Sequence, residues 1–138
     1  MTKNGIDLLK KHEGMRLQAY QDTVGVWTIG VGHTGGVRKD DVITLEQADL
    51  LLDADIYNAE RGARSLFDNW FDFSPVRQDA VVNLVFNLGK VGLSKFTTFI
   101  RCMRAEQYEA ASGALVQSKW YGQVGQRARD IVQMIREG

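Results

Sequence analysis

The apolar residues of the chain follow two different periods, one typical of helices and one typical of strands. NGIDLLKKH spaces its apolar residues as one face of a helix, and Gly14 follows, which predicts a helix over residues 4–13 capped by Asn4. Over residues 17–37, short apolar runs such as VWTIGVG alternate with glycines, and this texture predicts two or three strands joined by tight turns. The β region is therefore expected to cover about residues 14–43.

The period becomes helical again from Thr44. Thr44 and Gln47 form a capping-box pattern, and apolar residues then recur at steps of three and four, which predicts a connecting helix over about residues 45–64. SPVRQDAVVNLVFNLG starts with a serine cap followed by proline and ends at Gly89, and its apolar run predicts a central buried helix. Shorter helices are expected at residues 95–104, 106–117 and 126–136.

These elements predict an α+β fold that is mainly helical. A small β-hairpin lobe, a connecting helix and a helical lobe of about residues 65–138, together with the N-terminal helix, would form one domain with a cleft between the lobes. No run approaches the roughly 20 apolar residues of a membrane-spanning helix. The opening MTKNGIDLLKK lacks an apolar signal core, so we expect neither a stable membrane association nor a secretion signal.

The charged residues are distributed unevenly along the chain. The 44% apolar and 25% charged residues fit a globular protein, and the formal net charge is zero. Residues 38–75 nevertheless carry four Lys and Arg against nine Asp and Glu, whereas residues 90–136 carry eight against three. The basic C-terminal half favours an anionic partner, with solvated helix faces as the alternative. Nucleic acid is not expected, because zinc-finger spacing and arginine-rich runs are absent, and the single Cys102 is expected to be a buried, inert thiol.

The stretch EGMRLQAYQDTVGVWTIGVGHTG, residues 13–35, concentrates candidate chemistry at Glu13, Asp22, Thr28 and His33. Nine positions of an α-helix turn about 900°, so Glu13 and Asp22 could meet only where a helix end approaches the hairpin. Hydrolysis of a glycosidic bond needs two carboxylates flanking the sugar, and a hydroxyl beside the second could hold the attacking water. Solvated surface carboxylates are the alternative interpretation.

This stretch resembles the phage lysozyme, or endolysin, family, and its GHTG ending is similar to the lambdoid-prophage branch. The resemblance continues through ITLEQADLLLDADIYNAERG, AVVNLVFNLGKVGLSKFT and SKWYGQVGQRARDIVQMIREG, so it covers nearly the whole chain in one order and implies a lysozyme-like fold. The family's acid–Asp–Thr triad falls on Glu13, Asp22 and Thr28, with eight and five residues between them. The resemblance implies that Glu13 is the general acid, that Asp22 places or activates a water, and that Thr28 orients it. Attack by that water implies inversion at the sugar carbon.

Four further positions take a role from the resemblance. Arg127 matches an arginine that pairs with the catalytic glutamate, and His33 and Asp55 match a structural ion pair. A base or metal-ligand role for His33 is the alternative, although two isolated histidines give no ligand spacing. Phe86 matches a cleft-lining aromatic residue that contacts substrate, with core packing as the alternative.

The resemblance therefore predicts a muramidase acting on the glycan strands of peptidoglycan, at the β-1,4 bond between N-acetylmuramic acid and N-acetylglucosamine. It implies a monomer without metal or cofactor, held in the host cytoplasm until a holin gives access to the wall in the periplasm. Three alternatives stay open: a lytic transglycosylase, a catalytically idle sugar- or protein-binding module on the same fold, and a wall-degrading toxin. Thr34, Phe99 and Ala114 depart from the family's T-even member, so no subsite contact is assigned to them.

Overall fold

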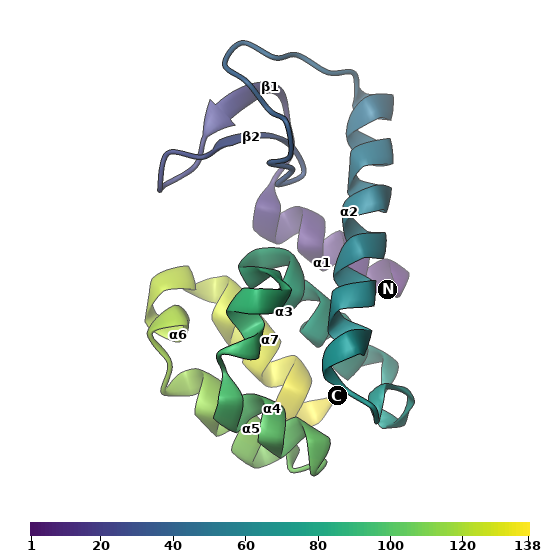
Figure 1. Ribbon diagram of the computed structural model, residues 1–138, viewed down its shortest axis with the longest axis vertical. Coiled ribbons are helices and arrows are strands. Elements are labelled where there is room, and N and C mark those ends of the chain that lie inside the picture. The colour runs from purple at the N-terminus through teal and green to yellow at the C-terminus, as the bar shows by residue number, and fades with distance from the viewer. The chain divides into compact units, whose positions relative to one another are not determined.

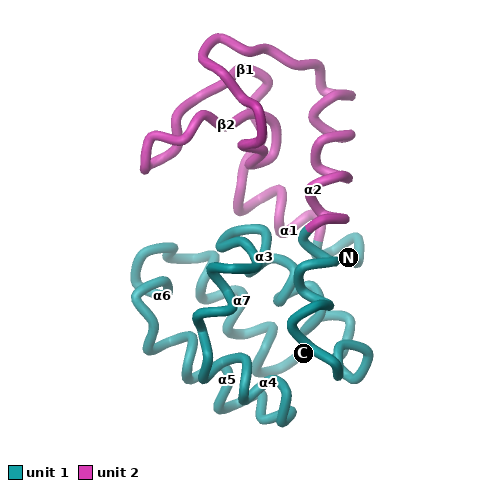
Figure 2. Tube along the Cα trace, in the orientation of Figure 1, with its two compact units in different colours: residues 1–5, 59–138 teal, residues 6–58 magenta.

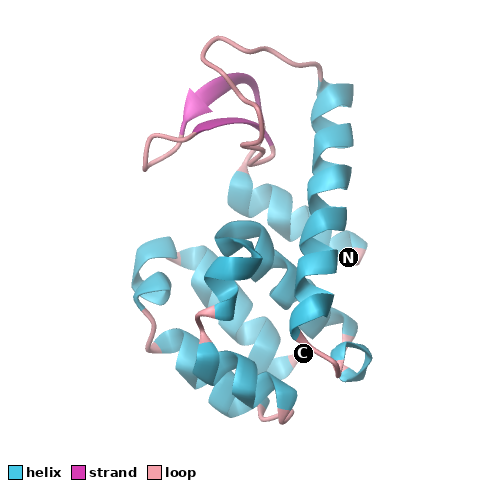
Figure 3. Ribbon diagram, in the orientation of Figure 1, coloured by secondary structure: helices cyan, strands magenta, loops and turns pink.

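The computed structural model describes residues 1–138, which form helices and a single two-stranded antiparallel sheet (Figure 1). Most of the chain is helical, as the colouring by secondary structure shows (Figure 3), so the predicted α+β, mainly helical fold is confirmed. None of the helices is both long enough and apolar enough to span a bilayer. The elements in chain order are α1 (Lys3–Glu13), β1 (Arg16–Gln21), β2 (Trp27–Gly30), α2 (Leu45–Leu66), the 3₁₀ helix η1 (Trp70–Asp72), α3 (Pro75–Ser94), α4 (Thr97–Arg104), α5 (Tyr108–Val116), α6 (Lys119–Val124) and α7 (Gln126–Glu137).

Backbone contacts divide the chain into two compact units, coloured separately in Figure 2. The hairpin unit comprises residues 6–58 and contains the sheet, and the helical unit comprises residues 1–5 and 59–138. Helices α1 and α2 each contribute to both units. The sequence-based division placed the whole N-terminal helix with the helical lobe, whereas α1 from Ile6 onward clusters with the hairpin.

The sheet of the hairpin unit is small and has only two strands. Its register places Tyr20 of β1 opposite Thr28 of β2, and an irregularity precedes Tyr20 on β1. On the other edge of β1, Gln18 forms an isolated antiparallel bridge with Val42, in place of a full third strand. A sheet of this size depends on packing against the rest of its unit for stability.

Two helix starts are fixed by the side chains that the sequence indicates. Before α2, the Thr44 N–H donates to Gln47 Oε1 (2.8 Å) and the Gln47 N–H donates to Thr44 Oγ1 (3.1 Å). These reciprocal bonds confirm the predicted capping box. Before α3, Ser74 Oγ accepts the N–H of Arg77 (3.2 Å), with proline at the first helical position as predicted.

The start of α1 differs from the prediction, since the cap is Thr2 and not Asn4. The helix begins at Lys3, and Thr2 Oγ1 accepts the N–H of Gly5 (3.0 Å), one of the donors that a first helical turn leaves unpaired. The N–H of Thr2 in turn donates to Asp79 Oδ1 (3.0 Å), and its hydroxyl donates to Asp79 Oδ2. Asp79 is 4% exposed and belongs to α3, so a buried carboxylate of the helical unit holds the beginning of α1.

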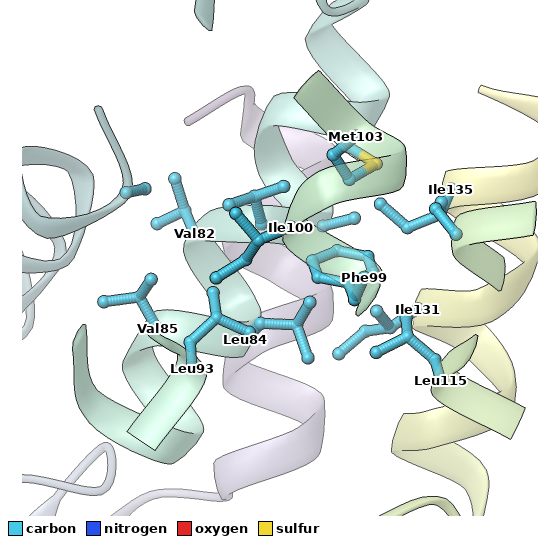
Figure 4. Packing of buried hydrophobic residues seen from close by; sticks show 14 of the residues in the cluster. Val82, Leu84, Val85, Leu93, Phe99, Ile100, Met103, Leu115, Ile131 and Ile135 are labelled. Atoms are coloured by element: carbon cyan, nitrogen blue, oxygen red, sulfur yellow. The ribbon is translucent and has the colours of Figure 1, made fainter. Parts of the chain in front are cut away.

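Apolar side chains from α2 to α7 form the core of the helical unit, part of which is drawn in Figure 4. Helix α3 is buried on nearly all sides between residues 80 and 85, as its continuous apolar run predicts. Around it, α7 packs against α3, α5 and α6, and α5 packs against α4. Cys102 lies in this core, as predicted.

Two features of the helical unit were not anticipated. Gly89, at φ +75°, interrupts α3 where its end was predicted, but the chain resumes a helical course to Ser94. Residues 119–124, which lie between two predicted helices, form the short helix α6, which is capped by the Ser118 hydroxyl accepting the N–H of Tyr121 (3.3 Å). A helix of six residues is too short to show an apolar period in the sequence.

Candidate active site

Glu13 is placed by the end of a helix. It is the last residue of α1 and is half-buried. Gly14 follows at φ +69°, and its N–H donates to the carbonyl of Lys10 (2.8 Å), which closes the helix as predicted. The carboxylate therefore projects from a regular element whose end is hydrogen-bonded.

Asp22 is placed by the turn between the two strands. Its Oδ1 accepts the N–H of Val24 (3.0 Å) and of Val26 (2.8 Å), and its own N–H donates to the carbonyl of Val26 (2.9 Å). One carboxylate oxygen therefore shapes the turn, as aspartate does in Asx turns. The other oxygen, Oδ2, makes no hydrogen bond within the protein and keeps its capacity to accept one.

Thr28 lies on β2 and is 3% exposed. Its hydroxyl donates to the carbonyl of Val26 (2.9 Å), the same carbonyl that accepts the N–H of Asp22. Because the hydroxyl proton is used in this bond, Thr28 Oγ1 can act toward a further group only as an acceptor. Asp22 and Thr28 are thus linked through the backbone of one residue, and each presents an acceptor oxygen.

The charges of Glu13 and Asp22 both act on Tyr20, their neighbour on β1. Burial raises the pKa of the Tyr20 phenol above its ordinary value, and the negative charges of Glu13 and Asp22 raise it further. The guanidinium of Arg16, whose Cζ lies 4.4 Å from the centre of the Tyr20 ring, lowers the pKa and offsets part of this effect. Within the hairpin unit, the helix end and the turn therefore contribute to one electrostatic environment.

The ion pair implied for His33 and Asp55 is present in the hairpin unit. His33 Nδ1 lies 2.7 Å from Asp55 Oδ2, and His33 Nε2 lies 2.9 Å from the carbonyl oxygen of Gly35. Both ring nitrogens of His33 therefore face protein oxygens, one of a carboxylate and one of a backbone carbonyl. Because both nitrogens are engaged by other groups of the hairpin unit, the geometry speaks against the alternative of a base or metal ligand. No group of three or more His, Cys, Asp or Glu side chains is arranged to hold a metal ion.

Arg127 and Phe86 both belong to the helical unit. Arg127 lies on α7 and is 9% exposed, and its Nε donates to Asn83 Oδ1 on α3 (2.9 Å). Its pairing with Glu13 stays a prediction. Phe86 is half-buried against the core of the helical unit, a position that suits the core-packing alternative, and its contact with substrate also stays a prediction.

A groove of about 400 Å³ opens on the helical unit between α4, α5 and α6. One wall is formed by Trp120, which is 5% exposed and whose Nε1 donates to Asn87 Oδ1 (2.7 Å). The hydroxyl and ammonium groups of the lining suit a polar ligand, such as a sugar. The lining comprises Lys95, Phe96, Thr97, Thr98, Phe99, Ala114, Ser118, Lys119 and Trp120.

Comparison with known proteins decides the family. Residues 10–135 match the phage lysozyme family. The chain belongs to the phage lysozyme family. It is 37% identical over 121 residues to the endolysin of Salmonella phage P22, covering 84% of this chain and 81% of that relative. It is 35% identical over 120 residues to the endolysin of Acyrthosiphon pisum secondary endosymbiont phage 1, covering 87% of this chain and 79% of the relative.

This lysozyme domain also has relatives in a different setting. The pre-baseplate central spike protein Gp5 of Enterobacteria phage T4 is 30% identical over 159 residues, which cover 96% of this chain but 27% of that protein. Membership of the phage lysozyme family makes the chain a lysozyme-type glycoside hydrolase.

Several polar and aromatic residues of the helical unit of this lysozyme were not found from the sequence. Trp120 and Lys119 lie in the SKWYG segment that carries the family resemblance, yet their place beside a groove has no local sequence signal. The Trp120 partner Asn87 and the Arg127 partner Asn83 are four residues apart on α3, and their spacing places both on one helix face. That pairing of polar residues inside an apolar helix is the signal that could have identified them.

Proposed function

We propose that this phage lysozyme hydrolyses the β-1,4 bond between N-acetylmuramic acid and N-acetylglucosamine in peptidoglycan, with inversion at the anomeric carbon. Protonated Glu13 gives its proton to the glycosidic oxygen as the bond from that oxygen to the anomeric carbon breaks. A water on the opposite sugar face forms the new bond to the anomeric carbon and passes a proton to the carboxylate of Asp22. Thr28 accepts the second hydrogen of the same water and fixes its orientation.

The observation that carries this proposal is the linkage of Asp22 and Thr28 through Val26. A solvated surface aspartate would not need a defined rotamer, whereas Asp22 has one oxygen fixed by the turn and the other left as an acceptor. The Thr28 hydroxyl is buried and oriented by the carbonyl that also accepts the Asp22 N–H. Two fixed acceptors on one turn suit the positioning of a water molecule, which has two hydrogens to donate.

We further propose that the groove beside Trp120 takes part of the substrate. Its lysines, Lys95 and Lys119, suit the carboxylates of the bacterial wall, and its hydroxyl groups suit the hydroxyls of a sugar. Arg127 would orient Glu13 by pairing with it, while its bond to Asn83 fixes the guanidinium. This chemistry uses no metal or cofactor and requires neither a nucleic acid nor a second copy of the chain.

In its biological setting we propose that the enzyme acts as an endolysin and lyses the host cell after a holin has opened the membrane. Accumulation in the host cytoplasm and action in the periplasm follow from this role. A wall-degrading toxin would use the same chemistry. The two settings differ in whether lysis of the producing cell requires co-expression of a holin.

The proposed activity is tested by comparing the parent with Glu13→Gln in clearing of permeabilised Gram-negative cells, with mass analysis of the products. Glu13→Gln removes the acidic proton at constant size, so we expect a folded protein without clearing activity. Parent products should carry a reducing end formed with one water, and anhydro products lighter by one water would instead indicate a lytic transglycosylase. A parent that binds peptidoglycan but releases no product would identify an idle binding module.

A further inference from the structure

Gly32 lies directly against the carboxylate of Glu13 in the hairpin unit. A Cβ added at Gly32 would lie 2.5 Å from Glu13 Oε2, 2.8 Å from Cδ and 3.2 Å from Cγ. Ordinary non-bonded contacts of carbon are about 3.5–4.0 Å, so the carboxylate occupies the place that a side chain would take. Of the positive-φ glycines, Gly32 is the one whose added Cβ would meet a carboxylate.

The backbone at Gly32 is held in place from both sides. Ile29 and His33 exchange two backbone hydrogen bonds of 2.9 Å each, which close a tight turn around Gly32. His33 is anchored in turn by Asp55 (2.7 Å), which belongs to α2. The turn therefore resists displacement, whereas the atoms of Glu13 that a Cβ would meet lie at the far end of a side chain with several single bonds.

We propose that Gly32 is a positioning residue for the acid, an inference that rests on the proposed role of Glu13. Because Gly32 has no side chain, the carboxylate of Glu13 lies against the backbone of the turn and keeps one orientation. A methyl group at this position would move the carboxylate while leaving the fold in place. General acid catalysis depends on this geometry, and a displacement of about 1 Å costs on the order of 10²-fold in rate.

Gly36 provides a matched control for this substitution. Gly32 and Gly36 have nearly the same backbone conformation, with φ +68° and +70°, but a Cβ at Gly36 would have nothing within 4 Å. Both alanine variants therefore introduce similar backbone strain, and only Gly32→Ala introduces contact with Glu13. We expect similar melting temperatures for Gly32→Ala and Gly36→Ala.

The rates of the two variants should differ. On soluble peptidoglycan strands, we expect kcat of Gly32→Ala to be on the order of 10²-fold below that of Gly36→Ala, with KM within about threefold. Equal kcat values for the two variants would overturn the inference. Unfolding of Gly32→Ala under conditions where Gly36→Ala stays folded would also overturn it, because the added methyl would then disturb the fold instead of Glu13.

A shorter acid gives a second measurement. Glu13→Asp withdraws the carboxylate by one methylene, so adding Gly32→Ala to this variant should lower kcat much less than it does in the parent. Equal fold-losses in both backgrounds would exclude an action of Gly32 through Glu13. The proposed function is tested separately, since it fails if Glu13→Gln keeps parent activity, whereas the inference fails if Glu13→Gln is inactive and the two glycine variants are equal.

Discussion

Asp22 and Val26 exchange two hydrogen bonds, because the Val26 N–H donates to the Asp22 carboxylate (2.8 Å) and the Asp22 N–H donates to the Val26 carbonyl (2.9 Å). The same aspartate thus has a structural oxygen and a chemically available one. An asparagine could reproduce the first function, since its amide oxygen accepts the same N–H groups, but it could not accept a proton from water at neutral pH. The structural role of Asp22 and its proposed catalytic role can therefore be separated by substitution.

Asp22→Asn is expected to fold with a melting temperature close to that of the parent and to lose on the order of 10²-fold or more in the rate of wall clearing. Asp22→Ala should lose activity to a similar extent and should in addition lower the free energy of unfolding by about 0.5–1.5 kcal/mol, because two exposed N–H groups of the turn exchange the carboxylate for water. Thermal unfolding and turbidity assays on the two variants measure both effects. Parent-like clearing by Asp22→Asn would contradict a role for the charge.

Thr28→Val keeps the shape of the side chain and removes its oxygen. The Val26 carbonyl still accepts the N–H of Asp22, so the free energy of unfolding should fall by no more than about 1.5 kcal/mol. Hydrolysis should slow by at least about tenfold, because the attacking water loses one of its two acceptors. Thr28→Ser restores the oxygen and should recover most of the rate in the same assay. A rate for Thr28→Val equal to that of Thr28→Ser would count against the water-positioning role.

The pKa of Tyr20 reports on the charges near it. Glu13→Gln removes the carboxylate with the larger effect on this pKa, so the pKa should fall toward 10, and Asp22→Asn should lower it by less. Arg16→Gln should raise it. NMR titration of the tyrosine ring measures each shift, and an unchanged Tyr20 titration in Glu13→Gln would contradict the proximity of the two groups.

The raised pKa of Tyr20 also sets the sign of a stability change. The folded protein keeps the phenol neutral at pH values where the unfolded chain has already lost the proton. The contribution of Tyr20 to the free energy of unfolding is therefore complete below about pH 10. It is lost as the pH rises through the pKa of Tyr20 in the folded protein. Tyr108, whose pKa is raised by burial and by the charge of Glu106, acts in the same direction. Urea unfolding at a series of pH values should show stability declining in this alkaline range.

The sequence predicted features that depend on neighbouring residues. The capping box of Thr44 and Gln47 and the helix stop at Gly14 follow from local hydrogen bonding, and the structure has both. Features set by distant residues were missed or misplaced. The sequence predicted Asn4 as the cap of α1, but the cap is Thr2. Thr2 also binds Asp79, which lies 77 positions further along the chain.

At the candidate site, two glycines also differ in a way that depends on residues distant in the sequence. In the sequence, Gly32 and Gly36 are equivalent members of a glycine-rich hairpin, and both take a positive φ. Only the folded unit distinguishes a glycine needed for its backbone conformation from one that also leaves space for a carboxylate. The proposed triad was predicted by resemblance, whereas the contacts of its residues required the structure.

Gly5 gives a final prediction, on the anchoring of α1. An added Cβ would overlap the Asp79 carboxylate and lie 2.5 Å from its Cγ. Asp79 cannot easily withdraw, since it is 4% exposed and accepts both the N–H and the hydroxyl of Thr2. Gly5→Ala should therefore lower the free energy of unfolding by about 1–3 kcal/mol, as overpacking does elsewhere.

Gly113 is the matched control, because it lies inside α5 and an added Cβ there would have nothing within 4 Å. Alanine is favoured over glycine within a helix by about 0.5–1 kcal/mol, so Gly113→Ala should raise the free energy of unfolding. Urea unfolding of the two variants measures the contrast. If Gly5→Ala were stabilised as much as Gly113→Ala, Asp79 would have room to move, and the beginning of α1 would not be held by the contacts of Thr2 with that carboxylate.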